Sequence, residues 1–246
     1  MGRVAAVTGA AHGIGRACAF RLAETVTEFS LVDRNEEGLL ETATDLMKRA
    51  GRQPLQFVSD VTQPHEVHRI VAQTVQHFGR IDILVNCAGG ADTKLPRQIE
   101  ETPLEAWDAQ VDLNLRSVFV FCREVVPIMR AGKYGRIVNI SSAAGRSTGR
   151  TKLIPYTAAK AGVLGLTREL ASPTSTIRRS RLWKINRLGL QVGTTFWGTE
   201  GGRSRSGRVR PRRWRSNCCS RSGRTTQRSL SSRLEASASG NTTSAE

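Results

Sequence analysis

Near its N-terminus the chain reads VAAVTGAAHGIG over residues 4–15. The apolar run predicts a short buried strand, the glycines predict a tight turn, and the apolar spacing that follows predicts a helix. In such a unit the glycines let the backbone approach a pyrophosphate, and the N–H groups at the helix N-terminus face its negative charge. An ordinary tight turn between strand and helix is the alternative interpretation.

The alternation of strand and helix patterns continues as far as residue 171. Strands are expected at residues 29–32, 55–58, 81–85 and 136–140, and helices at 36–50, 64–78, 103–131 (kinked or shortened by Pro127) and around 156–160. This order predicts an α/β fold with a Rossmann-like, doubly wound parallel sheet. Ligands of such sheets bind at the carboxyl ends of the strands. Several candidate residues fall at those ends: the glycine turn, Asp33, Asp60, residues 86–89 and Ser142.

Asp33 follows the second expected strand. A carboxylate about 20 residues after the glycine turn can hydrogen-bond both ribose hydroxyls of an adenosine and would repel a 2′-phosphate. We therefore expect NAD in preference to NADP, a preference that the nearby Arg16 and Arg34 would soften. The alternative is that Asp33 is a turn residue after a strand.

Residues 156–160 read YTAAK, which places Tyr156 and Lys160 one helical turn apart on one face. A free tyrosine has a pKa of about 10 and is a poor base at neutral pH, whereas a fixed cation beside it favours the phenolate. Ser142 would hold the oxygen of an alcohol or ketone while the phenol moves the proton. An exposed helical pair is the alternative explanation of the Tyr–Lys spacing.

The basic charge of the chain is unevenly distributed. The net charge is +16 over 246 residues, yet residues 1–171 hold 21 Lys/Arg against 18 Asp/Glu, and residues 172–246 hold 16 against 3. No apolar run approaches the roughly 20 residues that span a bilayer, and glycines interrupt what would be the apolar region of a signal peptide. The five cysteines have neither metal-ligand spacing nor a disulfide framework. We expect a cytoplasmic protein with no membrane contact and no metal.

Together the motifs resemble the short-chain dehydrogenase/reductase family over residues 3–171. The stretches that carry the resemblance are Thr8-Gly9-x-x-x-Gly13-Ile14-Gly15, Asp60-Val61, Asn86-x-Ala88-Gly89, Asn114, Asn139-Ile140-Ser141-Ser142 and Tyr156-x-x-x-Lys160. The resemblance implies hydride transfer between NAD, or less favourably NADP, and a small secondary alcohol or its ketone. It also implies a homo-oligomer formed through residues 103–131 and the helix that carries Tyr156.

The resemblance assigns cofactor-binding roles to residues after the first four strands. These are Thr8, Gly9, Gly13 and Gly15 in the turn, Ile14 under the pyrophosphate, Asp33 at the adenosine ribose, Asp60 and the Val61 backbone at the adenine, and Asn86, Ala88 and Gly89 beside the central strand. His12 is expected to be a solvent-facing spacer. Cys87 is expected to be a small core residue and not a nucleophile.

The resemblance also assigns the catalytic roles. Tyr156 is the general base in oxidation and the acid in reduction, Lys160 binds the nicotinamide ribose, and Ser142 orients the substrate oxygen. Asn114 holds a water that continues the proton relay. Two alternatives stay open: Ser141 in place of Ser142, and a purely structural amide at Asn114.

After Ala171 the resemblance ends. The family would continue with a strand of the type Ile-Arg-Val-Asn-x-x-x-Pro-Gly, and we find no convincing strand here. Residues 172–246 hold 14 of the 20 serines, and long stretches have almost no apolar residues. We therefore expect a disordered basic tail where the C-terminal part of the sheet belongs. The chain divides into an incomplete NAD(P)-binding domain, residues 1–171, and an Arg/Ser-rich segment, residues 172–246.

The hypothesis that we prefer for this segment is a shifted reading frame. Moving residues 225–234 by one base permits codons for Asp-Asp-x-Ala-Val-Ala-Phe-Leu-Ala-Ser, which resembles a late helix of the family. One alternative is a damaged remnant that at most binds dinucleotide. Another is a basic surface for nucleic acid or an acidic membrane, centred on Arg203, Arg205, Arg208, Arg210, Arg212, Arg213, Trp214 and Arg215.

Overall fold

A parallel sheet forms the centre of the fold. The computed structural model describes residues 2–26, 28–51, 53–95, 98–146, 153–171, 180–184 and 191–198. Five strands run parallel in the order β3-β2-β1-β4-β5: β1 (Val4–Thr8), β2 (Glu28–Asp33), β3 (Leu55–Val58), β4 (Ile83–Asn86) and β5 (Tyr134–Ile140). This topology confirms the predicted Rossmann-like sheet.

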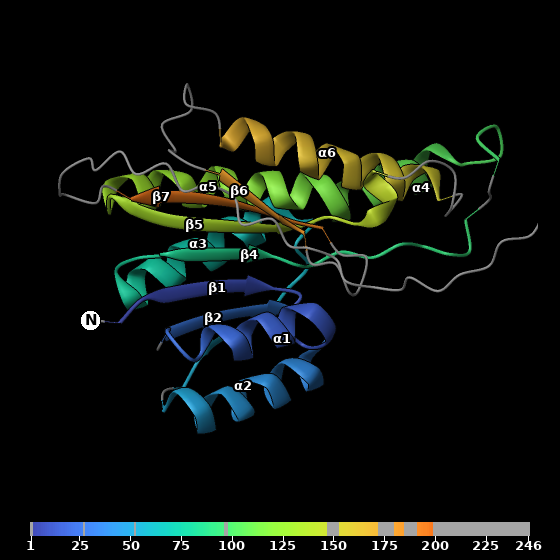
Figure 1. Cartoon of the computed structure of the whole chain (residues 1–246). Helices are drawn as coiled ribbons and strands as arrows, with labels where there is room; N and C mark the ends of the chain where they lie inside the picture. Colours follow the sequence, from blue (N-terminus) through green and yellow to red (C-terminus); the bar gives the residue numbers. More distant parts are fainter. Residues whose placement is uncertain are drawn as a thin grey trace, which may run out of the picture. The chain divides into compact units, whose positions relative to one another are not determined.

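Helices cover both faces of this sheet. The helices α1 (Gly13–Leu22) and α2 (Glu36–Ala50) lie on one face, and α3 (Pro64–Phe78), α5 (Ser117–Ala131) and α6 (Ile154–Leu170) lie on the other (Figure 1). Alternate residues of β1 supply both cores: Ala5 and Val7 pack with the α1/α2 cluster, and Ala6 packs with the opposite cluster. The apolar strand sequences follow from this burial on two faces.

The predicted ends of two helices are confirmed. The helix α2 begins after Asn35, whose side chain accepts a hydrogen bond from the Gly38 N–H. It ends at Gly51 and α3 ends at Gly79, both in the left-handed conformation with φ of 73° and 75°. Glycine adopts this conformation without the steric cost that a Cβ would bring.

The expected single helix over residues 103–131 is wrong in detail. The structure divides it into α4 (Leu104–Val111), a π-helical turn η1 (Asp112–Arg116) and α5. In η1 the Ser117 N–H donates to the oxygen of Asp112, five residues earlier. Such π turns insert one extra residue and often mark functional sites. Pro127 lies inside α5, which continues to Ala131.

Two strands follow residue 171, where we expected none. The backbone of β7 (Gln191–Gly198) pairs antiparallel with β5, and β6 (Ser180–Lys184) pairs antiparallel with β7. The β7 sequence contains Val, Thr, Phe and Trp, which favour strands. The predictions of a disordered basic tail, a shifted reading frame and a nucleic-acid surface concern mainly residues that the structure does not describe.

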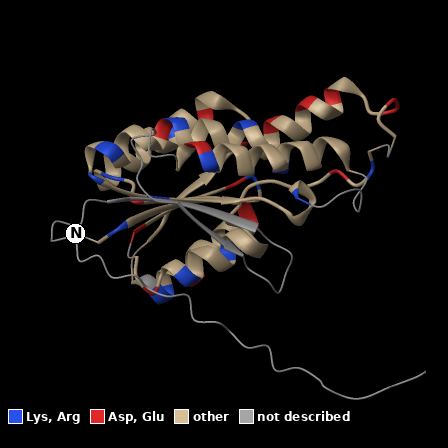
Figure 2. Cartoon of the chain, turned by 45° about the horizontal axis from the view of Figure 1, so that its top comes forward, with Lys and Arg blue, Asp and Glu red and all other residues tan. Residues whose placement is uncertain are grey.

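Acidic and basic residues are intermixed along the helices of the described part (Figure 2). This distribution agrees with the small charge excess of residues 1–171. None of the helices in the described ranges has both the length and the apolar character that crossing a membrane requires.

Candidate active site

The predicted site residues meet at one edge of the sheet. The strands β1, β2, β4 and β5 are parallel, so their carboxyl ends share that edge. The glycine turn follows β1, Asp33 ends β2, Asn86 ends β4, and Ser141 and Ser142 follow β5. The structure thus brings together segments that lie far apart in the sequence.

The three glycines of the turn have different roles. Gly9 has a φ of 68°, and a Cβ there would lie 2.8 Å from the Ala88 nitrogen. A Cβ on Gly15 would lie 2.0 Å from the oxygen of Gly9, so these two glycines allow backbone segments to pack closely. At Gly13, with a φ of 56°, no atom of the described residues would lie within 4 Å of a Cβ.

The N-terminus of α1 is suited to an anion. Its first position is Gly13, and the preceding residue, His12, is exposed and makes no side-chain capping bond. The first N–H groups of a helix lack partners within the helix and carry partial positive charge. The open space at Gly13 and these N–H groups fit the phosphates of a dinucleotide.

Thr8 supports the loop after β4. Its hydroxyl oxygen accepts hydrogen bonds from the N–H groups of Cys87 and Ala88, both at 3.0 Å, and lies 3.5 Å from the Val85 oxygen. The side chain is 2% exposed. Thr8 therefore holds the end of β4 beside the glycine turn through the backbone.

Asp33 is buried and held by two backbone groups. One carboxylate oxygen accepts from the Ala11 N–H and the other from the Asn35 N–H, each at 3.0 Å. The side chain thus has the local turn contacts that one interpretation predicted. Each oxygen retains a further lone pair that can accept from a ribose hydroxyl.

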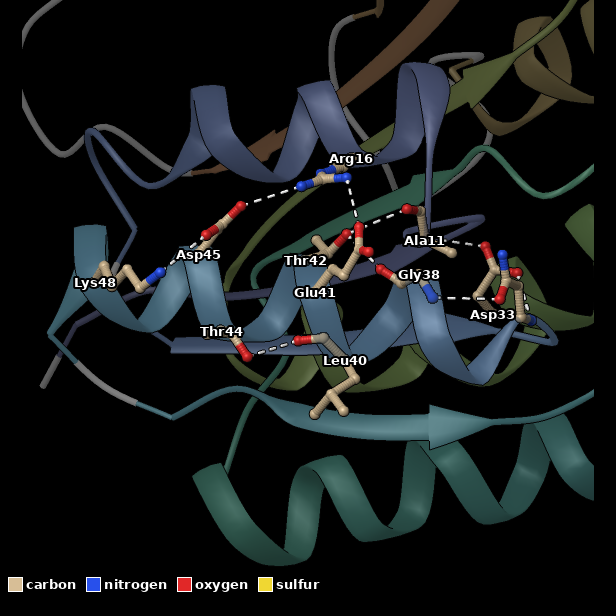
Figure 3. Close-up of polar contacts among 11 residues, drawn as sticks. Ala11, Arg16, Asp33, Gly38, Leu40, Glu41, Thr42, Thr44, Asp45 and Lys48 are labelled. Carbon is tan, nitrogen blue, oxygen red and sulfur yellow. Dashed lines mark hydrogen bonds and ion pairs between the residues drawn. The ribbon is translucent and has the colours of Figure 1, made fainter.

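The two arginines near Asp33 differ in their surroundings. Arg16 on α1 forms ion pairs with Glu41 and Asp45 of α2, at 3.4 and 3.1 Å (Figure 3). Arg34 is exposed. Arg16 is therefore directed toward α2 by two carboxylates.

The proposed adenine-binding pair follows β3. Asp60 is exposed, and its carboxylate accepts from the Thr62 N–H at 2.9 Å. Val61 is 6% exposed and belongs to the core on the α3/α5 face.

Lys160 is a buried cation beside Tyr156. Its side chain is 4% exposed, and its Nζ donates to the backbone oxygen of Ile140 at 3.0 Å. The same Nζ lies 5.8 Å from the centre of the Tyr156 ring, and Tyr156 is half-buried. Burial lowers the pKa of Lys160 to about 8, because desolvation disfavours the charged amine.

The two serines after β5 have distinct contacts. The Ser141 hydroxyl is buried and donates to the Lys160 backbone oxygen at 2.7 Å. Ser142 is half-buried, and its hydroxyl accepts from the Ala144 N–H at 3.2 Å, capping the 3-10 turn η2 (Ala143–Gly145). Among the described residues the Ser142 hydroxyl donates to no partner, whereas the Ser141 hydroxyl donates to the backbone of α6.

Asn114 lies in η1 and is fully buried. Its Nδ2 donates to the oxygens of Gly90 and Gln110, and its Oδ1 accepts from the Gly90 N–H. A Cβ on Gly89 would lie 2.7 Å from Asn114 Oδ1 and 3.1 Å from Lys160 Nζ. The structural role of the amide is thus visible, and its place beside Gly89 brings it near the Lys160 cation.

A buried amide network joins β4, β5 and α6. Asn86 Nδ2 donates to Asn139 Oδ1 at 2.8 Å, and Asn139 Nδ2 donates to Thr167 Oγ1 at 3.0 Å. Thr167 Oγ1 in turn donates to the Val163 oxygen. Sequence reasoning missed Thr167, although a threonine four residues after Val163 on the buried face of a helix is a recognisable signal.

The predictions for Cys87 and His12 agree with their surroundings. Burial is the main cause that raises the pKa of the Cys87 thiol to about 12, which leaves little thiolate at neutral pH. His12 is exposed on the turn.

The sequence pattern of the short chain dehydrogenase family matches residues 3–178, so the chain belongs to that family. It is 39% identical over 169 residues to (2S)-((R)-hydroxy(phenyl)methyl)succinyl-CoA dehydrogenase subunit BbsD of Thauera aromatica, covering 69% of this chain and 66% of that protein. A 3-oxoacyl-(acyl-carrier-protein) reductase of Staphylococcus epidermidis is 34% identical over 181 residues, which is 72% of each chain.

Two similar solved structures contain different nicotinamide cofactors. A variant of actinorhodin polyketide ketoreductase with NADPH is 36% identical, with a TM-score of 0.62 over 69% of this chain and 64% of that chain. An NAD+-bound xylitol dehydrogenase is 33% identical, with a TM-score of 0.63 and the same coverage. The chain therefore spans less than two thirds of the length of these two structures and of the Thauera relative.

Proposed function

We propose that this chain is a nicotinamide-dependent oxidoreductase that interconverts a small secondary alcohol and its ketone. The observation that carries the proposal is the buried Lys160 ammonium, fixed by the Ile140 oxygen and 5.8 Å from the Tyr156 ring. The amine and the phenol lie one helical turn apart on α6, which places a cation beside the group that moves the proton. The family to which residues 3–178 belong supports the same activity.

The proposed chemistry assigns the proton to the chain's own residues. A bound nicotinamide dinucleotide supplies the hydride acceptor in oxidation and the hydride donor in reduction. In oxidation, Tyr156 takes the hydroxyl proton of the alcohol. The C–H bond on the carbon that bears this hydroxyl breaks as its hydride leaves for the nicotinamide, and a C=O bond forms. In reduction, Tyr156 returns that proton to the oxygen. Ser142 donates a hydrogen bond to the reacting oxygen, and Asn114 extends the proton path beyond Lys160.

Matched tyrosine variants test this role. The chain has two tyrosines, and Tyr134 lies at the opposite end of β5, where its hydroxyl has no hydrogen-bond partner among the described residues. Tyr156→Phe is expected to lower turnover by about 100-fold or more while NADH binding persists, because general acid–base catalysis contributes about that much. Tyr134→Phe is the control and is expected to keep turnover.

The assay uses a panel of secondary alcohols and ketones with NAD(H) and NADP(H). It includes a 3-oxoacyl thioester, because one relative is named a 3-oxoacyl-(acyl-carrier-protein) reductase. Equal turnover by Tyr156→Phe and Tyr134→Phe would show that the assigned mechanism is wrong.

We propose NAD as the preferred cofactor. The support is the buried Asp33 carboxylate at the end of β2, together with Arg16, which two carboxylates of α2 hold. A negative charge at this position repels the 2′-phosphate of NADP. Asp33→Ser is expected to reduce the ratio of NADPH to NADH dissociation constants by about tenfold or more, a size consistent with one charge contact. An unchanged ratio contradicts the preference.

A second candidate function is dinucleotide binding without turnover. The observation in its favour is that the chain aligns with only 64% of the length of the two cofactor-bound structures. Wild-type protein that binds NADH and turns over none of the panel would support this candidate over the first.

The division of the chain after residue 171 remains our proposal. The family match ends at residue 178, which supports the proposal that the reading frame shifts near that point. Resequencing the gene across codons 165–246 tests the shifted frame. A single base whose correction restores an Asn-x-x-x-Pro-Gly strand would establish it, and an unchanged sequence would refute it.

We also propose a homo-oligomer formed through α4, α5 and α6. Three large apolar residues on these helices are exposed: Leu104 at 76%, Phe119 at 49% and Trp107 at 38%. Light scattering after size exclusion tests this, and Phe119→Asp is expected to shift the protein toward the monomer.

A further inference from the structure

The helix α2 contacts the glycine turn at Ala11. The Ala11 N–H donates to Asp33 at 3.0 Å, and Thr42 Oγ1 lies 3.3 Å from the Ala11 oxygen (Figure 3). The same Oγ1 lies 2.9 Å from the Gly38 oxygen, so one hydroxyl hydrogen is shared between two carbonyl oxygens. Thr42 is fully buried.

Gly38 allows this approach. A Cβ on Gly38 would lie 3.1 Å from both the Cβ and the oxygen of Ala11. That spacing is tighter than an ordinary van der Waals contact, so a side chain here would push α2 away from the turn. Gly38 and the Thr42 hydroxyl therefore both contact the peptide group that carries the Ala11 oxygen.

The orientation of the Ala11 oxygen determines that of the next N–H. A peptide unit is planar and trans, so the C=O of Ala11 and the N–H of His12 point in opposite directions. Holding the oxygen toward α2 thus directs the His12 N–H away from α2, at the start of α1. Asp33 holds the preceding peptide unit through the Ala11 N–H.

We infer that Thr42 is a positioning residue for dinucleotide binding. Its hydroxyl fixes the Ala11 carbonyl, and through it the backbone N–H groups that receive the cofactor phosphates. The inference rests on the proposed function, because it requires that the glycine turn binds a dinucleotide. Thr42 itself is buried beneath the turn and acts on the cofactor only through the backbone of Ala11.

The chain provides a matched control in Thr44. This residue lies on the same helix, is exposed, and its hydroxyl donates to the Leu40 oxygen at 2.9 Å (Figure 3). It therefore makes the same type of bond within the helix as Thr42 does to Gly38, without any contact to Ala11. Comparing Thr42→Val with Thr44→Val separates the contact to the turn from the bond within α2.

The test measures the dissociation constant of NADH by fluorescence titration. Thr42→Val is expected to raise it about three- to tenfold, the loss typical of one hydrogen bond. Thr44→Val is expected to leave it within about twofold, as exposed substitutions usually do. Thr42→Ser keeps the hydroxyl and is expected to restore tight binding. Where turnover is measured, kcat at saturating NADH is expected to be unchanged in Thr42→Val.

A second variant keeps the test decisive if Thr42→Val does not fold. Gly38→Ala leaves the Thr42 hydroxyl in place but crowds Ala11, and it is expected to weaken NADH binding. Its control is Gly165→Ala on α6, where the one atom of the described residues that a Cβ would meet outside the helix backbone is a nitrogen of the Arg168 guanidinium, at 4.0 Å.

The outcomes distinguish the two levels of inference. Wild-type protein that binds NADH, with Thr42→Val as tight as Thr44→Val, overturns the role of Thr42 and leaves the proposed function standing. If Gly38→Ala binds NADH as tightly as its control Gly165→Ala, the role of Thr42 is likewise overturned and the proposed function stands. Wild-type protein that binds neither NADH nor NADPH overturns the proposed function and this inference with it.

Discussion

The ammonium of Lys160 lies 3.0 Å from the backbone oxygen of Ile140, the last residue of β5. A helix side chain thereby satisfies a carbonyl at the edge of the sheet where the candidate site residues gather. The contact fixes the cation next to Tyr156 and withdraws it from water. The stability of the fold and the electrostatics of the site therefore depend on the same amine.

Lys160→Met is expected to change how stability depends on pH. Burial lowers the Lys160 pKa from 10.5 to about 8, so the unfolded state binds this proton more tightly than the folded state. The amine therefore destabilises the fold fully below pH 8, and its penalty is relieved as the pH rises from about 8 to 10.5. The relief is at most on the order of 3 kcal/mol. Urea unfolding at several pH values measures it: wild type gains stability relative to Lys160→Met over this interval, and parallel profiles would contradict the buried cation.

Thr8→Val is expected to destabilise the protein by about 2–4 kcal/mol, because two N–H groups, of Cys87 and Ala88, lose their shared acceptor. Thr8→Ser retains the hydroxyl and serves as the control. Urea unfolding of both variants provides the free energies. The bridging role of the Thr8 oxygen is incorrect if the two variants are equally stable.

Gly13 and Gly15 are expected to respond differently to alanine. Gly15→Ala places a methyl 2.0 Å from the Gly9 oxygen and should prevent native folding. Gly13→Ala meets open space and costs only the positive φ, roughly 1–2 kcal/mol. Because its methyl occupies the space at the start of α1, it should weaken NADH binding by tenfold or more, on the order of 1.4 kcal/mol. Circular dichroism and NADH titration check both; a folded Gly15→Ala or a tightly binding Gly13→Ala would oppose these assignments.

Thr167→Val is expected to weaken the attachment of α6 to the sheet. The substitution leaves the buried Asn139 Nδ2 without its acceptor, at a cost of about 1–3 kcal/mol. Thr167→Ser should recover most of this loss. Hydrogen exchange along α6 provides a second measurement, because faster exchange in the valine variant alone indicates local loosening. Equal protection in both variants would mean that the network does not anchor α6.

Much of the fold follows from local sequence patterns. Apolar runs predict the five parallel strands, and the glycines that end α2 and α3 predict the helix boundaries at residues 51 and 79. These signals are local because burial on two faces and a left-handed φ each restrict the residue type at one position. The motif spacing likewise predicts that Lys160 and the residues after β1, β2, β4 and β5 share one edge.

Other features depend on contacts between distant segments. The helix expected at residues 103–131 contains the π turn η1, and within that turn Asn114 bonds to Gly90, a residue after β4. The sequence favours Ser142 and leaves Ser141 open as the alternative, whereas in the fold Ser141 donates to the Lys160 backbone oxygen and Ser142 caps η2. Neither distinction has a local signal, because each depends on which polar group the packed chain leaves without a partner.

By itself, then, the sequence determined the order of strands and helices as far as residue 171, the glycine turn and the spacing of Tyr156 and Lys160. Only the tertiary structure decided that Thr42 of α2 lies beneath Ala11 and that the Lys160 cation bonds to Ile140. The physical reason is the distance along the chain over which each effect acts. Backbone conformation and amphipathic periodicity act over a few residues, whereas the pairing of buried polar groups is settled only when separate elements pack and water is excluded.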